Sequence, residues 1–272
     1  MTRSDFATRR LIGFMLAASL ASTIGGLPFN ALPVLLGSLA DSFALDARSI
    51  GLMGSVCFAG YLVGTLGAPF WMNRLDWRWL TGLSALGTAA SFAASAAVSD
   101  VRALYVIWAL IGFFASTMTC LGMRILADLP NKERAYGVRQ GVELSVTALV
   151  LFALPPLVIA PFKYPGAALA LAAVVSALGL SAFALPRRPH TQEEATAGGL
   201  ALPRSAWIAL GVFLLFLIGN IGLWAFLERL GSSLAISPAQ MGLVFAVLKL
   251  LGGVAAFAVA ALGGRLPQRS AF

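Results

Sequence analysis

The residues from Ser49 to Met72 form an apolar run without a single charge, which few folds can accommodate. As a helix rising 1.5 Å per residue, this run would be about 36 Å long, enough to cross a hydrocarbon core of about 30 Å. It is followed by NRLDWRW, a polar segment with two arginines and two tryptophans. Arginine beside a span marks the cytoplasmic side, and tryptophan favours the headgroup layer. We therefore predict a transmembrane helix that runs from outside to inside.

The composition of the whole chain extends this prediction. Hydrophobic residues make up 59% and charged residues 11%, whereas soluble domains carry about 25% charge. The net charge of +8 could suggest a nucleic-acid partner, but the basic residues lie in short loops between apolar segments, as in membrane proteins. We predict an all-α, polytopic transmembrane bundle that has the lipid bilayer, and no nucleic acid, as its surroundings.

Seven further apolar segments complete a prediction of eight spans, which lie at residues 11–39, 49–72, 80–98, 103–126, 135–160, 166–185, 205–227 and 238–262. The first is too long for a signal-peptide core and is expected to be retained. Its second half contains Gly25, Gly26, Pro28, Asn30 and Pro33. Because proline removes a backbone donor and glycine loosens a helix, we expect a kink there.

The basic residues give the chain an orientation. With the N-terminus inside, fourteen lysines and arginines fall on the cytoplasmic side, and only Arg48, Arg102, Lys163 and Arg229 fall outside. Such a bias places both termini in the cytoplasm. We expect a multi-pass protein of the cell (inner) membrane.

A weak internal repeat links the second and eighth spans. Seven residues recur 191 positions later, namely Gly51, Leu52, Val56, Val63, Arg74, Leu75 and Arg78, at Gly242, Leu243, Val247, Val254, Arg265, Leu266 and Arg269. A repeat of this size suggests a transporter with two parallel halves. We predict a six-helix bundle at residues 1–186, a cytoplasmic linker at 187–204, and a partial second bundle at 205–272 with its first two helices.

The loop after the second span resembles a signature of the major facilitator superfamily of secondary transporters. In GAPFWMNRLDWRW, Arg74 and Arg78 match the family's basic positions, Asn73 stands at its acidic position, and Asp76 stands where it has glycine. Six helices, a basic central loop and a restart also resemble the layout of this family.

A second loop, ADLPNKERAYG, is similar to the family's proline, acidic and arginine pattern after helix 4, through Pro130, Glu133 and Arg134. The resemblance implies a permease that moves a small solute by alternating access, with a proton or other ion as a possible coupling partner. Family members often have twelve helices, so we expect this chain to be truncated after the eighth. At the helix 4 position where the family often has an arginine, this chain has Trp108.

Polar residues within the spans are the candidates for a solute or ion cavity, because they are costly at bilayer depth. Arg139 and Glu143 are one helical turn apart and can pair, either in a cavity or as a lock between helix ends. Lys249 falls near the middle of the eighth span, so we expect a wet cavity, an acidic partner, or a partner on helices absent from this chain. Asn30 and Asn220 lie in the first helix of each half, where an amide can bind solute or join helices.

Enzyme chemistry is not predicted. The chain has one histidine, His190, and two cysteines in separate spans, Cys57 and Cys120, which predict neither a metal site nor a cofactor site. Two interpretations stay open: a gradient-driven transporter, or a truncated, non-transporting membrane protein that would not complete a transport cycle alone. Small residues in the eighth span would permit self-association of such a chain. A membrane-embedded enzyme ranks third because no catalytic cluster is evident.

Overall fold

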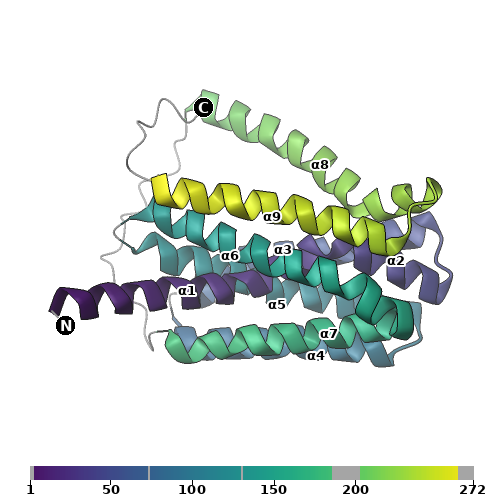
Figure 1. Cartoon of the computed structure of the whole chain (residues 1–272), viewed down its shortest axis with the longest axis horizontal. Helices are drawn as coiled ribbons and strands as arrows, with labels where there is room; N and C mark the ends of the chain where they lie inside the picture. The colour runs from purple at the N-terminus through teal and green to yellow at the C-terminus, as the bar shows by residue number, and fades with distance from the viewer. Residues whose placement is uncertain (1–2, 73, 130, 186–202, 263–272) are drawn as a thin grey trace.

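The computed structural model describes residues 3–72, 74–129, 131–185 and 203–262. Its helices are α1 (Arg3–Asn30), α2 (Leu32–Phe43), α3 (Ala47–Met72), α4 (Trp77–Ala97), α5 (Val101–Ala127), α6 (Lys132–Ala153), η1 (Leu154–Ile159), α7 (Ala160–Gly179), η2 (Leu180–Ala184), α8 (Arg204–Ser233) and α9 (Pro238–Leu262). No strand occurs among these residues, so the predicted all-α membrane bundle is confirmed (Figure 1).

Seven helical segments of the described chain are long and apolar enough to cross a membrane, and the longest runs from Lys132 to Ala184. At 1.5 Å per residue its 53 residues would extend about 80 Å, far more than one bilayer. The backbone of Lys163 has φ 56° and ψ −155°, which breaks the helical path, and Figure 1 shows α7 returning antiparallel to α6. This segment therefore makes two passes, in agreement with the eight that the sequence predicts.

The expected kink in the first span is a break at Ala31, between α1 and α2. Pro33 lies in the first turn of α2, where its missing N–H costs nothing. A second irregularity follows α6, where Pro155 and Pro156 fall within the π-helical turn η1 and each lacks a backbone N–H for the ordinary helical ladder. The interruption of the first span bears on function, because Asn30 is the last residue of α1.

Close packing of α3 on α5 depends on glycine. A β-carbon on Gly60 would lie 1.9 Å from the carbonyl oxygen of Ala109, and one on Gly112 would lie 1.9 Å from that of Cys57. These are backbone atoms that cannot move aside, so only glycine permits this approach. The other main pairs are α6 with α9, α4 with α7, and α1 with both α5 and α6. Thus α1 lies at the centre of the bundle, and α9 is attached through α6 (Figure 1).

Helix α8 is attached at only one end. Its buried residues are Trp224, Glu228 and Gly231, all in its last third. There Arg229 bonds to Asp41 of α2 at 2.9 Å and to the carbonyl oxygen of Gly37 at 2.8 Å. Nearly all earlier residues of α8 are exposed, and Figure 1 shows this part diverging from α9. The start of α1, the start of α8 and the end of α9 lie at one end of the bundle.

Candidate functional site

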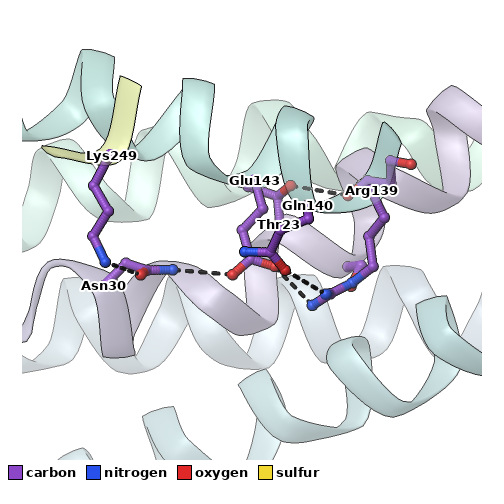
Figure 2. Close-up of polar contacts among 8 residues, drawn as sticks. Thr23, Asn30, Arg139, Gln140, Glu143 and Lys249 are labelled. Atoms are coloured by element: carbon purple, nitrogen blue, oxygen red, sulfur yellow. Dashed lines mark hydrogen bonds and ion pairs between the residues drawn. The ribbon is translucent and has the colours of Figure 1, made fainter. Parts of the chain in front are cut away.

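A chain of polar side chains connects three helices in the middle of the bundle (Figure 2). Lys249 of α9 donates from Nζ to Oδ1 of Asn30 at 2.7 Å, and Asn30 donates from Nδ2 to Oε1 of Glu143 at 3.0 Å. Glu143 in turn accepts from Nη2 of Arg139 at 2.7 Å on its other oxygen, Oε2. Four of the five predicted cavity residues therefore form one connected network, which we call the central network: Asn30, Arg139, Glu143 and Lys249.

The orientation of the Asn30 amide follows from its two neighbours. A lysine ammonium only donates hydrogen bonds and an ionised carboxylate only accepts them, so Oδ1 must face Lys249 and Nδ2 must face Glu143. The amide thus lies between a positive group and a negative group and is polarised by both. Asn30 is 3% exposed, and as the last residue of α1 it lies between Lys249 of α9 and Glu143 of α6.

Glu143 is held by packing as well as by hydrogen bonds. A β-carbon on Gly26 of α1 would lie 2.3 Å from its Oε1, so the carboxylate occupies space that only glycine leaves open. Its partner Arg139 also donates from Nε to Oγ of Ser22 at 2.7 Å and from Nη1 to the side chain of Gln140 at 3.1 Å. The predicted pairing of Arg139 with Glu143 is confirmed, and the pair joins α6 to α1.

Lys249 is half-buried and lies near the midpoint of α9. Its ammonium sits 4.1 Å from the centre of the Trp224 ring, a cation–π contact between α9 and α8. Trp224 donates from its indole nitrogen to the carbonyl oxygen of Phe29 at 3.2 Å and packs against Phe245. Within the described residues, no carboxylate lies within 4 Å of the ammonium, and Asn30 connects it to Glu143.

The remaining predicted cavity residue lies apart from the central network. Asn220 is exposed on α8. It lies one helical turn before Trp224, in the part of α8 that stands away from the bundle, whereas α8 contacts the bundle only from Trp224 onward. The predicted correspondence between Asn30 and Asn220 therefore does not bring the two amides together in this conformation.

The loop after α3 holds several of the predicted signature residues, whose conformational role stays a prediction. Arg74 is exposed, whereas Asp76 caps α4 by accepting from the backbone N–H of Arg78 at 2.8 Å. The Arg78 side chain donates from Nε to the carbonyl oxygen of Leu185, which ties the start of α4 to the residue that follows η2. The predicted signature residue Asn73 lies outside the described residues.

In the loop after α5, Glu133 and Arg134 are exposed in the first turn of α6. Asn131 caps that helix by accepting from the backbone N–H of Arg134 at 2.9 Å. The predicted signature residue Pro130 lies outside the described residues, as do 187–202 of the linker and the repeat positions Arg265, Leu266 and Arg269.

Sequence reasoning did not single out several residues that shape the site. Trp224 and Gly26 are invisible as site residues because an aromatic residue or a glycine in an apolar span usually serves packing. At the helix 4 position discussed above, buried Trp108 donates to the hydroxyl of Tyr164 at 3.0 Å, and that hydroxyl donates to Ser95 at 3.0 Å. Trp108 therefore joins α5 to α7 and α4 in a polar contact apart from the central network.

Two further features of the described residues bear on which ligands the bundle can hold. The described residues contain no group of three histidine, cysteine or acidic side chains that could hold a metal ion. A separate groove of about 570 Å³ lies between α2, α3 and α8, and apolar side chains such as Leu36, Phe58, Ile218 and Phe226 line it. The central network offers hydrogen-bond donors on Lys249 and Arg139 and an acceptor carboxylate on Glu143, and through Asn30 it joins α9 to α1 and α6.

Comparison with known protein families agrees with this architecture. The family model described as Major Facilitator Superfamily matches residues 12–272, nearly the whole chain. A comparison with curated individual proteins returned no match. The seven apolar segments of membrane-spanning length among the described residues and a family match over almost the full length lead to one conclusion: the chain belongs to the Major Facilitator Superfamily and is a membrane transporter of that type.

Proposed function

We propose that the chain is a secondary transporter that moves a small solute by alternating access, with the central network as its solute and ion site. The observation that carries the proposal is the hydrogen-bonded path from Lys249 through Asn30 to Glu143. The path joins α9 to α1 and α6 at mid-membrane depth. Charged groups at this depth are costly unless they are paired or hydrated, and for that reason they mark solute and ion pathways.

The network couples binding to a change of conformation. Asn30 uses its carbonyl oxygen on Lys249 of α9 and its amide nitrogen on Glu143 of α6. A solute that competes for the oxygen would weaken the link between α9 and α1, and one that competes for the nitrogen would weaken the link between α1 and α6. A proton on Glu143 would have a related effect, because the neutral acid accepts the Asn30 and Arg139 hydrogen bonds less strongly. Binding of a solute at the Asn30 carbonyl oxygen thus favours separation of α9 from α1, a motion between the first and second bundles of the kind that alternating access requires.

We assign the end of the bundle that holds the starts of α1 and α8 to the cytoplasm of the cell (inner) membrane. Arg74, Arg124 and Lys132 lie at helix ends on this side, whereas Arg48 and Arg229 lie at the opposite end. This distribution agrees with the positive-inside rule. The Arg78 contact with Leu185 then ties two cytoplasmic helix ends, which supports a conformational role for the signature loop.

The division into residues 1–186, a linker and 205–272 stays a prediction. The correspondence of the two halves that the repeat implies, α1 with α8 and α3 with α9, also stays a prediction. In each of these pairs the two helices run in the same direction through the bundle (Figure 1), as a parallel repeat requires. Self-association is also a prediction. In α9, Gly252 and Gly253 already lie against α6, so α8 is the surface on which a second copy would be sought.

A second candidate, a non-transporting membrane protein, is favoured by a different observation. Only the last third of α8 is buried, so the two bundles share few contacts through it. Alternating access needs two bodies that close in turn over a central site. Transport by residues 1–272 is therefore the decisive property.

The experiment uses purified chain in proteoliposomes, a defined mixture of sugars, amino acids, organic acids and nucleosides outside, and an imposed pH gradient. Mass spectrometry then measures which solutes accumulate inside. We expect accumulation of at least one solute above protein-free liposomes, its loss with Glu143→Gln, and normal accumulation with Asp46→Asn, a matched loss of one carboxylate at an exposed position before α3. Absence of accumulation under either gradient direction would establish the non-transporting alternative.

A further inference from the structure

The central network carries an excess of positive charge. It contains two cationic groups, Arg139 and Lys249, and one anionic group, Glu143. Arg139 is paired directly with Glu143 at 2.7 Å, which leaves the ammonium of Lys249 as the uncompensated charge. A net positive charge within a membrane span is unfavourable, and a bound anion would remove most of that cost.

The surroundings of Lys249 suit an anion that is organic. On one side the ammonium contacts Asn30, and on another it lies over the Trp224 ring. Trp224 packs against Phe245, with ring centres 5.1 Å apart and ring planes inclined by 58°, so the charge lies beside a cluster of two aromatic rings. Lys249 is half-buried rather than enclosed, and an ammonium has three donors, of which one is committed to Asn30. A carboxylate on an apolar body fits both features.

We propose that Lys249, Asn30 and Trp224 form an anion subsite for a small organic carboxylate, which rests on the proposed transport function and names its solute class. The carboxylate accepts a charge-assisted hydrogen bond from Lys249, and its apolar body lies against Trp224. It accepts from an N–H of Lys249 that is not bonded to Asn30, and it shares the charge of the ammonium with Oδ1 of Asn30, so binding also weakens the contact between α9 and α1. Anionic lipid headgroups are not the source of this anion, because Lys249 lies near the middle of its span.

The test measures binding to the purified chain in detergent, without any gradient. The probes are benzoate and octanoate, each with its neutral amide, and sodium chloride at matched ionic strength as the inorganic anion. We expect both carboxylates to raise the unfolding temperature saturably, while the amides and chloride do not. The variant Lys249→Gln should weaken carboxylate binding about tenfold or more, as for loss of a charge-assisted hydrogen bond.

Two further variants keep the result interpretable. Lys249→Arg keeps the charge and should retain part of the binding, and Lys132→Gln removes an exposed lysine at the start of α6 and should leave it unchanged. A Lys249→Gln protein that unfolds at the same temperature without ligand as the parent shows that the fold is intact. If the Lys249→Gln variant is unstable, carboxylate binding by Lys249→Arg is compared with binding by the parent chain: weakened binding supports the subsite, and unchanged binding contradicts it.

Four outcomes would overturn the subsite: no response to either carboxylate, equal responses to carboxylate and amide, an equal response to chloride, or full binding by Lys249→Gln. Its failure can be told apart from failure of the proposed function. If carboxylates bind through Lys249 but no solute crosses the membrane, the anion subsite stands and the proposed transport function fails. If only neutral or cationic solutes accumulate and no carboxylate binds, the transport function stands and the anion subsite fails.

Discussion

The ion pair between Arg139 and Glu143 can be measured with a double-mutant cycle. Its side chains are 12% and 8% exposed, so solvent screens their attraction little. Removing one partner of a buried pair leaves the other charge uncompensated, at a cost of about 3 kcal/mol. Glu143→Gln keeps the shape and the acceptor for Asn30, so it isolates the loss of charge. Arg139→Gln removes the opposite charge, together with the hydrogen bonds to Ser22 and Gln140.

We expect each single variant to lower the free energy of unfolding by about 3 kcal/mol, and the double variant by about the same amount rather than by about 6 kcal/mol. The coupling energy would then be about 3 kcal/mol. The assay is titration of the purified chain in mixed micelles with sodium dodecyl sulfate, followed by tryptophan fluorescence. Glu133→Gln, at an exposed position on the same helix, should change the free energy by less than about 1 kcal/mol. Single effects that add within about 0.5 kcal/mol would show that the two charges do not stabilise one another.

Three other expectations concern the packing of α3 on α5, the contact of Arg229 with α2, and the topology. Gly112→Ala should prevent close approach of α3 and α5 and lower the yield of folded chain, whereas Gly82→Ala, with nothing within 4 Å of the added carbon, should not; gel-filtration profiles distinguish these outcomes, and equal profiles would refute the packing argument. Arg229→Ala should cost only about 1 kcal/mol or less, because its partner Asp41 is exposed, yet widen the distance between the outer ends of α2 and α8; spin-label distances that stay unchanged would contradict this. A reporter fused after the last residue should be active only in the cytoplasm, and activity outside would invert the proposed orientation.

The sequence by itself determined the class, the spans and the family. Apolar runs of helical length are a local property, since each must satisfy its own backbone hydrogen bonds in lipid. The pairing of Arg139 with Glu143 was equally predictable, because four residues is one helical turn and the helix itself brings the two side chains together. The position of the break near Asn30 was predicted only approximately, because several glycines and prolines compete for it.

Only the tertiary structure decided which polar residues form one site. Asn30 meets Glu143 from 113 positions away and Lys249 from 219 positions away, and no periodicity within one helix encodes such contacts. Asn220 has the same side-chain chemistry as Asn30, yet it is exposed because α8 meets the bundle only from Trp224 onward. Gly26 and Trp224 gained their roles in the same way, because the space beside Glu143 and the ring beside Lys249 exist only once α1, α6, α8 and α9 are packed together.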